Sequence, residues 1–372
     1  MKKTIILGAA LLALNAFAAM SEPQTLWRAG DNGIRSYRIP ALCTAPNGDL
    51  VAACDARTNN GGDLNVHQPI NITIRRSSDN GKTWTEPVNS WDWPWEAGSK
   101  WSGSDPSFIV DKKAKKIFLF YNVWDWTTTE GGNGVYLFYV QESADNGKTW
   151  SKPRDITKEI AFEDWPFFAK RGDSGFIFIS SGSGIQTKSG ALLHTLVHAN
   201  GKRGNAIFGS LDHGKTWKSF GKPTNGGDEC KIVELADGSW MINSRCGGCR
   251  RLIHISKDKG ETWESHFDNN LMDPGCNAQI MRFGNNEKKI LLYTGCKSSG
   301  RNNVTLRVST DDGKTWTEGI TICEGGSAYS DITILKDKSI GVLWEGAGYQ
   351  VIDFAVVPAA DIMAEIKKGM KK

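Results

Sequence analysis

The 372-residue sequence has little excess of charge of either sign, since 45 Lys and Arg residues stand against 41 Asp and Glu residues. A near-neutral chain gives no electrostatic reason to expect a nucleic-acid partner. Beyond an apolar run near the N-terminus, no segment is long and apolar enough for a membrane-spanning helix. We therefore expect neither a nucleic-acid partner nor a membrane span.

Motifs for several well-known chemistries are also missing. The sequence has no phosphate-binding glycine loop, no HExxH pair and no EF-hand pattern. Residues 172–175, Gly-Asp-Ser-Gly, are similar to a serine-protease motif, but a protease would need a matching His and Asp and a different fold. The motifs therefore give no reason to expect a nucleotide site, a zinc-protease site or an EF-hand.

Only eight cysteines are present, and their pairing cannot be deduced from their spacing. Cys246 and Cys249 form a single C-x-x-C pair, without a second such pair or histidines at zinc-finger spacing. We interpret these two residues as a structural disulfide or as two buried thiols.

Residues 1–18 have the pattern of a signal peptide. Lys2 and Lys3 precede an apolar run at 5–14, and Ala-Phe-Ala at 16–18 is a small-x-small cleavage signal. The sequence therefore predicts an exported protein, periplasmic or secreted, that is cleaved near residue 18. The mature chain is expected to form one domain over residues 22–372.

An eight-residue pattern, S-x-D-x-G-x-T-W, recurs five times. The copies lie at residues 77–84, 143–150, 210–217, 256–263 and 309–316. Each copy is typical of a hairpin turn, because Ser and Asp hydrogen-bond turn backbone, Gly adopts positive φ, and Trp packs against the body. Strand-like runs precede the copies, and the repeating unit is about fifty to sixty residues long. The repeats therefore predict the blades of an all-β propeller.

The even spread of the repeats predicts one closed domain, since propeller blades bury their faces only against neighbouring blades. The 41 Gly and 15 Trp residues fit a turn-rich, all-β composition. Residues 361–371 have helical spacing and predict a short C-terminal helix.

Four arginines, Arg38, Arg57, Arg245 and Arg301, follow or interrupt the predicted strands of different repeats. A guanidinium group offers a flat fork of donors that suits a carboxylate, so several converging arginines would bind an acidic ligand. Arginine is also a common surface charge, and spacing alone does not separate these two roles.

The sequence Tyr37-Arg38-Ile39-Pro40, followed by five copies of the repeat, resembles the exo-α-sialidase (neuraminidase) family, in which the repeats are called Asp-boxes. The resemblance covers about residues 26–354. It implies an all-β, six-bladed β-propeller of four-stranded antiparallel sheets with a central site. One blade is then expected to lack the box.

The resemblance also implies which residues bind the substrate. Arg38, Arg245 and Arg301 match the three arginines that grip the sialic acid carboxylate, with Arg307 as the weaker candidate for the third place. Glu345 resembles the carboxylate that holds the first arginine. Arg57 and Asp105 resemble the residues that line the pocket around position 4 of the sugar.

Three further residues match the family's catalytic groups: Asp63 the acid/base, Tyr329 the nucleophile and Glu229 the partner that activates it. Because the anomeric carbon of sialic acid carries a carboxylate, a neutral phenol avoids the repulsion that a carboxylate nucleophile would meet. The phenol has a pKa near 10, so an adjacent Glu must take its proton. Asp63 would protonate the leaving oxygen and later deprotonate water, with net retention.

The expected partners are sialylated glycoproteins, glycolipids or oligosaccharides, and the expected form is a monomer that needs no cofactor and no catalytic metal. Several alternatives remain open. A trans-sialidase, including an intramolecular one, would share the catalytic residues. A non-catalytic sialic-acid-binding propeller would have no use for Tyr329 and Glu229, and another Asp-box glycosidase or receptor would not need three arginines. Taken alone, Asp63 could merely cap a turn and Tyr329 could be a core residue.

Overall fold

The structure is a computed structural model that describes residues 19–96, 98–127, 135–160, 177–198, 203–248, 250–284 and 288–371. Three features of the sequence lie outside these ranges: the predicted signal peptide at 1–18, the Gly-Asp-Ser-Gly segment at 172–175, and Cys249.

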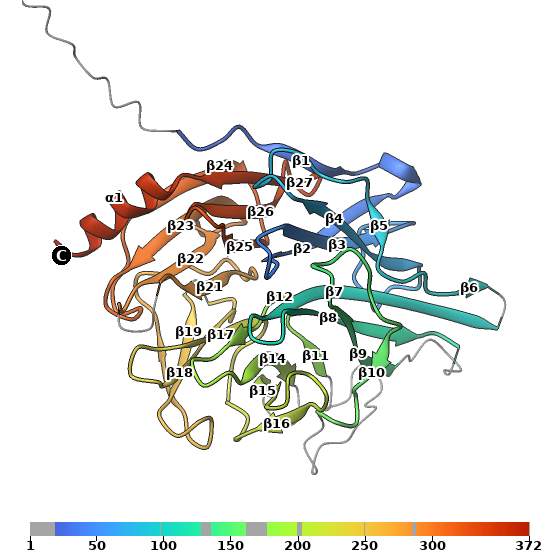
Figure 1. Cartoon of the computed structure of the whole chain (residues 1–372), viewed down its shortest axis with the longest axis horizontal. Coiled ribbons are helices and arrows are strands. Elements are labelled where there is room, and N and C mark those ends of the chain that lie inside the picture. Colours follow the sequence, from blue (N-terminus) through green and yellow to red (C-terminus); the bar gives the residue numbers. More distant parts are fainter. Residues whose placement is uncertain are drawn as a thin grey trace, which may run out of the picture.

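Six β-sheets surround a common centre, which confirms the predicted six-bladed propeller (Figure 1). Blade 1 contains β2 (Ser36–Thr44), β3 (Leu50–Arg57), β4 (Ile70–Ser77) and β5 (Val88–Asn89). Blade 2 contains β7 (Ser99–Asp111), β8 (Lys116–Asp125), β9 (Val135–Ser143) and β10 (Arg154–Asp155), with β6 (Trp95–Glu96) and β12 (Gly182–Ser183) added beside β7. Blade 3 contains β11 (Ile177–Ile179), β14 (Leu192–His198), β15 (Gly204–Ser210) and β16 (Lys218–Phe220), with β13 (Ile185–Gln186) beside β14.

The other three blades have four strands each. Blade 4 contains β17 (Cys230–Glu234), β18 (Trp240–Ser244), β19 (Leu252–Ser256) and β20 (Glu264–Phe267). Blade 5 contains β21 (Gln279–Arg282), β22 (Leu291–Cys296), β23 (Asn302–Ser309) and β24 (Ile320–Gly326). Blade 6 contains β25 (Ser330–Ile334), β26 (Ile340–Gly346), β27 (Val351–Val357) and β1 (Gln24–Arg28). The four main strands of every blade pair antiparallel.

The ring is closed by the N-terminal strand. β1 pairs antiparallel with β27, and Gln24 lies opposite Phe354. The outer strand of blade 6 therefore comes from the opposite end of the chain. Because no hairpin joins β27 to β1, blade 6 has no turn in which a box could form, and this accounts for five boxes in six blades.

Each box stabilises the turn between the third and fourth strands of its blade. In the first box, Ser77 Oγ donates to Asp79 Oδ1 and accepts from the Gly81 N–H, both at 2.8 Å. The Asp79 carboxylate accepts from the Thr83 N–H at 2.9 Å and from Thr83 Oγ1 at 2.6 Å. The other four boxes repeat these bonds. Asn80 and Gly81 have φ values of 61° and 84°, which the turn requires.

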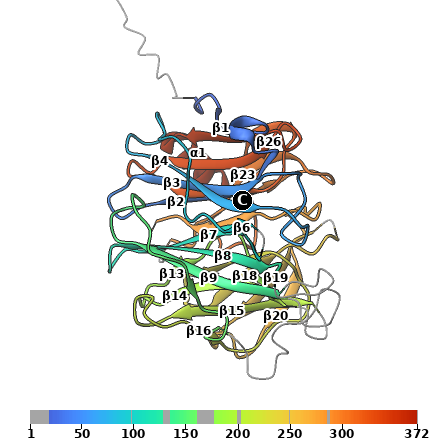
Figure 2. The ribbon, with the colours of Figure 1, turned by 90° about the vertical axis from the view of Figure 1, so that its right-hand side faces the viewer.

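The core lies between neighbouring blades, which are stacked as layers in Figure 2. The helix α1 (Ala359–Gly369) packs against β23 and buries Ile362 and Ile366 in the cluster between blades 5 and 6. A short 3-10 turn, Asp31–Gly33, follows β1. Across the described ranges, the structure contains no helix of the length and apolarity needed to cross a membrane.

Candidate active site

Glu345 is a buried carboxylate that fixes the first arginine. It lies near the end of β26 with its side chain fully buried. Its Oε1 accepts from Arg38 Nε at 2.6 Å and from the Ile39 N–H at 2.9 Å, and its Oε2 accepts from the Tyr329 N–H at 3.2 Å. Ile39 has a φ of 62°, which is strained for a β-branched residue, and the β2–β3 register shifts after Arg38. The bulge therefore points Arg38 in a direction set by Glu345.

Tyr329, Glu229 and Arg245 form a hydrogen-bonded triangle. Tyr329 directly precedes β25, and Glu229 directly precedes β17. The phenol O–H donates to Glu229 Oε2 at 2.6 Å, while Arg245 Nη1 donates to the phenol oxygen at 2.9 Å and to Glu229 Oε2 at 2.5 Å. The tyrosine, which is 7% exposed, thus has a base and a cation at its hydroxyl.

The pKa of Tyr329 is raised well above the ordinary value, first by burial and then by the negative charge of Glu229, although Arg245 acts in the opposite direction. The resting phenol is therefore protonated at neutral pH, and its proton lies on the hydrogen bond to Glu229. Transfer of the proton to Glu229 is the step that would make this oxygen a nucleophile.

Arg301 completes a group of three arginines around the same tyrosine. Its guanidinium lies 5.4 Å from the centre of the Tyr329 ring, and it donates to Tyr349 Oη at 3.0 Å and to the Gly275 carbonyl at 2.7 Å. The guanidinium of Arg38 lies 5.8 Å from the same ring centre. Since Arg245 bonds the phenol directly, all three arginines surround Tyr329.

Arg307, the weaker candidate for the third arginine, does not reach this site. Its Nε donates to the Thr317 carbonyl at 2.6 Å, and its Nη1 donates to the Asn270 carbonyl. Thr317 directly follows the fifth box in blade 5, and Asn270 lies in the segment between β20 and β21 that links blades 4 and 5, so Arg307 ties blade 5 to that link.

Arg57 joins two carboxylates at the end of β3. It donates from Nε and Nη2 to Asp55 Oδ2 at 3.0 and 2.8 Å, and from Nη1 to Asp63 Oδ1 at 2.8 Å. The side chains of Arg57 and Asp55 are completely buried, whereas that of Asp63 is 73% exposed. Asp63 therefore presents its second oxygen to solvent, where a substrate could meet it.

Asp105 lies beside Asp55 and Arg57, in a bulge of β7. Its φ is 63°, its N–H donates to Asp55 Oδ1 at 2.9 Å, and its Oδ2 accepts from Asn122 Nδ2 at 3.0 Å. Burial, and then the negative charge of Asp55, raise the pKa of Asp105 well above its ordinary value. Burial and the neighbouring carboxylate thus favour the neutral form of this side chain relative to an exposed aspartate.

The two halves of the site lie close enough for their charges to act on one another. The charge of Arg57 acts on Arg38, and the charge of Glu229 acts on Asp105. The structure thus brings together the whole predicted set: Arg38, Arg57, Asp63, Asp105, Glu229, Arg245, Arg301, Tyr329 and Glu345. Within the described ranges, no group of three or more His, Cys, Asp or Glu residues could hold a metal ion.

Two residues of the site were missed by sequence reasoning. Tyr349 lies in the turn after β26, where its ring centre is 4.3 Å from the Arg38 guanidinium and its hydroxyl bonds Arg301. No sequence pattern pointed to it. Asp55 precedes Arg57 by two residues on one strand, so the two side chains share a face, and this spacing could have suggested the pair.

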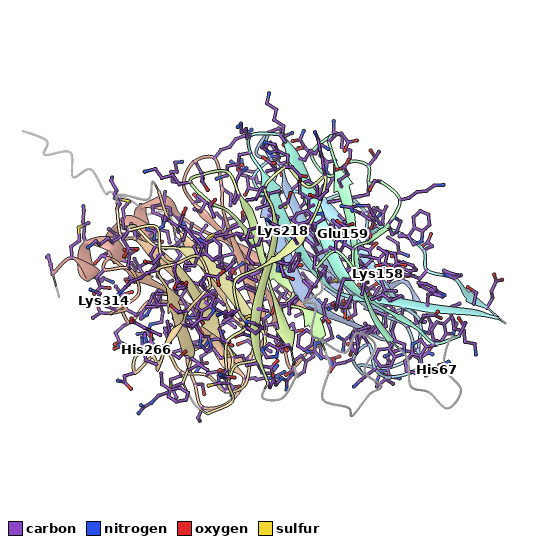
Figure 3. All side chains as sticks on the ribbon, turned by 90° about the horizontal axis from the view of Figure 1, so that it is seen from below. His67, Lys158, Glu159, Lys218, His266 and Lys314 are labelled. Carbon is purple, nitrogen blue, oxygen red and sulfur yellow. The ribbon has the colours of Figure 1, made fainter. Side chains whose placement is uncertain are left out.

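An aromatic cluster supports the loop that carries Asp63. Leu64 packs with Trp124, and Trp126 packs against them. His67, at the lower right of Figure 3, has its ring centre 4.9 Å from that of Trp95 and 5.0 Å from that of Trp126. These contacts hold the loop on the hairpin of β7 and β8.

The profile of one protein family, described as the BNR repeat-like domain, matches residues 39–343. The chain belongs to this family. The match includes all five boxes and strands of all six blades.

Several proteins that are similar to this chain are named as sialidases. It is 34% identical over 351 residues to a sialidase of Micromonospora viridifaciens, a match that covers 87% of this chain and 52% of the relative. It is 28% identical over 345 residues to a sialidase of Bacteroides fragilis, with 86% and 61% covered. The chain thus spans only about half to three fifths of these curated relatives. A solved structure, a Hadza microbial sialidase, superposes with a TM-score of 0.80 at 27% identity, covering 91% of this chain and 69% of the other. These findings confirm the resemblance to the exo-α-sialidase family.

Proposed function

We propose that this protein is an exo-α-sialidase, which hydrolyses terminal α-linked sialic acid from glycoconjugates with retention through a tyrosyl-enzyme intermediate. The observation that carries the proposal is the triangle of Tyr329, Glu229 and Arg245, enclosed by two further arginines. A binding protein needs cations for the carboxylate, but it has no use for a buried phenol hydrogen-bonded to a base.

The first step is binding of the substrate carboxylate by Arg38, Arg245 and Arg301. Three guanidinium groups supply paired donors for two carboxylate oxygens. Because Glu345, Glu229 and the Gly275 carbonyl already hold them, little side-chain entropy is lost on binding. The carboxylate would then place the anomeric carbon over the phenol oxygen of Tyr329.

In the second step the glycosidic bond breaks. Asp63, in its protonated form, gives a proton to the leaving oxygen, while Glu229 takes the proton of Tyr329 and the phenol oxygen bonds the anomeric carbon. The leaving group departs as a neutral alcohol. Arg245, which contacts both the phenol oxygen and Glu229, stabilises the negative charge that passes between them.

In the third step water replaces the tyrosine. Asp63, now ionised, takes a proton from a water molecule that attacks the anomeric carbon, and Glu229 returns its proton to the phenol oxygen. Two inversions give net retention. A neutral nucleophile suits this substrate, since a carboxylate at the position of Tyr329 would repel the carboxylate of the sugar.

The predicted signal peptide would export the enzyme, where sialylated glycoproteins, glycolipids and oligosaccharides are within its reach. A trans-sialidase would use the same residues and pass the sugar to an acceptor hydroxyl instead of water. Product analysis with and without lactose separates the two reactions: a sialyl-lactose product indicates transfer, whereas free sialic acid in both cases indicates hydrolysis.

The experiment that tests the proposal is release of a fluorophore from a sialic acid glycoside by the wild type and by Tyr329→Phe. The wild type is expected to release the fluorophore, and the variant to lose at least about a thousandfold in kcat, because the bond-forming oxygen is gone. An inactive wild type, folded by circular dichroism, would contradict the proposed activity. Full activity of the variant would contradict the proposed nucleophile.

A further inference from the structure

Two buried cysteines lie against each other behind the candidate active site. Cys276 and Cys296 belong to one buried cluster, each is 3% exposed, and each thiol shifts the pKa of the other. Both are thiols in the structure. We propose that Cys276 and Cys296 are the sites of an intramolecular disulfide that forms when the chain folds in an oxidising compartment.

The fold brings these two cysteines to adjacent strands. Cys276 precedes β21 by three residues and Cys296 ends β22, and these adjacent antiparallel strands pair Gln279 with Thr294. Both cysteines belong to the same buried cluster. Cys323 is one strand too far from Cys296, because Val304 of β23 lies between them and pairs with both.

The position of the pair gives the disulfide a consequence for the site. The carbonyl of Gly275, the residue before Cys276, accepts from Arg301 Nη2 at 2.7 Å. The thiol of Cys296 donates to the carbonyl of Ser327 at 3.5 Å, two residues before Tyr329. A bond between the two sulfurs would therefore join two supports of the site. One is the loop with Gly275, which holds Arg301, and the other is the end of β22, which contacts the segment before Tyr329.

The chemistry is thiol–disulfide exchange with a donor disulfide, such as oxidised glutathione or a disulfide-donating oxidoreductase. The thiolate of Cys296 attacks the donor, forms a mixed disulfide and releases one donor thiol. Cys276 then loses its proton and attacks the sulfur of Cys296, which releases the second donor thiol. The two cysteines lose two electrons and two protons in total, and the donor gains them.

Burial of the pair determines when this exchange takes place. A donor cannot approach a sulfur that is 3% exposed, so oxidation occurs before β21 and β22 pack fully. Once formed, the bond closes a loop of 21 residues (296 − 276 + 1) and restricts the unfolded chain. The disulfide is then shielded from reductants as long as the protein remains folded.

The test is refolding of the guanidinium-unfolded wild type in two buffers, one with oxidised and reduced glutathione and one with excess dithiothreitol. Each product is denatured, alkylated without reduction and digested for mass spectrometry. We expect the glutathione product to contain a linked peptide with Cys276 and Cys296, 2 Da below the sum of the two thiol peptides. We also expect its Tm to exceed that of the reduced product by roughly 5 °C.

Variants make the assignment specific. Cys276→Ser should lose the linked peptide and leave Cys296 open to alkylation, whereas Cys43→Ser, which changes a cysteine on β2, should retain the link. Alkylation of both Cys276 and Cys296 in the glutathione product would overturn the proposal. A disulfide that joins Cys276 or Cys296 to a different cysteine would also overturn it. Since masses are read without substrate, this result is independent of whether the protein hydrolyses sialosides.

Discussion

The phenol oxygen of Tyr329 lies 2.6 Å from Oε2 of Glu229, although the two residues are 100 positions apart in the chain. Tyr329 precedes the inner strand of blade 6 and Glu229 that of blade 4. The closed ring brings the two strand starts to its centre, and Arg245 contacts both side chains there. The propeller thus places a carboxylate within hydrogen-bond distance of a phenol, which is the arrangement that the proposed mechanism requires.

Replacement of the base should slow the chemical step. Glu229→Gln keeps the shape and accepts a hydrogen bond from Tyr329, but it cannot take the proton at neutral pH. We expect kcat on a fluorogenic sialoside to fall by about 10²- to 10⁴-fold, the usual contribution of a general base. Unchanged kcat in this variant, at unchanged thermal stability, would show that Glu229 does not activate the phenol.

Replacement of the carboxylate that orients Arg38 should act mainly on binding. Glu345→Gln removes the charge that faces Arg38 and weakens the bonds to the N–H groups of Ile39 and Tyr329. We expect kcat/KM to fall by about 10²-fold, with a clear rise in KM, because a misplaced arginine no longer matches the substrate carboxylate. The conservative Glu345→Asp should not restore it, since its shorter side chain cannot reach all three donors. Steady-state kinetics with wild-type values of KM would rule out this orienting role.

Ring closure by β1 should contribute strongly to stability. Trp27 of β1 is 2% exposed and packs in the cluster between blades 6 and 1. Trp27→Ala should lower the free energy of unfolding by about 3–5 kcal/mol, as for other large buried aromatics. The control is Val88→Ala on the outer strand β5, where the side chain is 60% exposed and the change should stay within about 0.5 kcal/mol. Equal denaturation midpoints for the two variants would contradict closure through β1.

Buried histidines should make the protein less stable in acid. Burial lowers the pKa of His194 to about 3 and that of His254 to about 4, with nearby Lys231 and His266 respectively acting in the same direction. Between pH 6.5 and the lowered pKa values, these histidines bind protons only in the unfolded chain. The free energy of unfolding is therefore unaffected by them above pH 6.5 and falls as the pH drops below it. For His254 alone the loss by pH 4 is on the order of 2–3 kcal/mol.

Denaturant unfolding at several pH values measures this effect as the slope of the free energy of unfolding against pH. His254→Gln should flatten the fall in stability between pH 6.5 and 4, whatever its effect at neutral pH. His67→Gln should leave the slope nearly unchanged, because His67 is exposed in the loop before β4, on the side of Figure 3 opposite His266. Parallel pH profiles for the wild type and His254→Gln would contradict this origin of the acid sensitivity.

Much of the fold could be predicted because the boxes are local. The bonds from Ser77 and Asp79 stay within one turn, so their sequence pattern is complete in itself. Closure through β1 could not be predicted in this way, because the pairing of Gln24 with Phe354 depends on the geometry of the whole ring.

In the site, too, residues in local motifs could be predicted, and residues whose roles depend on distant contacts could not. Arg38 was found through its motif, and Arg301 was preferred to Arg307 through the resemblance and because Arg307 sits inside the strand that leads into the fifth box. The structure separates the two, since Arg301 lies over the Tyr329 ring and Arg307 donates to the backbone carbonyls of Thr317 and Asn270, away from the site. Tyr349 was missed because its role depends on two arginines that are distant in sequence. The proximity of Cys276 and Cys296 in one buried cluster could not be predicted either, because it depends on how β21 and β22 pair.

Covalent trapping on Tyr329 tests the proposed mechanism most directly. A sialic acid that carries fluorine at carbons 2 and 3 offers a good leaving group and slows the breakdown of the intermediate, so the sugar should accumulate on the enzyme. We predict that mass spectrometry after rapid quenching and digestion finds one added fluorosialyl group, on the peptide that contains Tyr329, and none in Tyr329→Phe. Turnover of a sialoside with no such adduct, or an adduct on another residue, would contradict it.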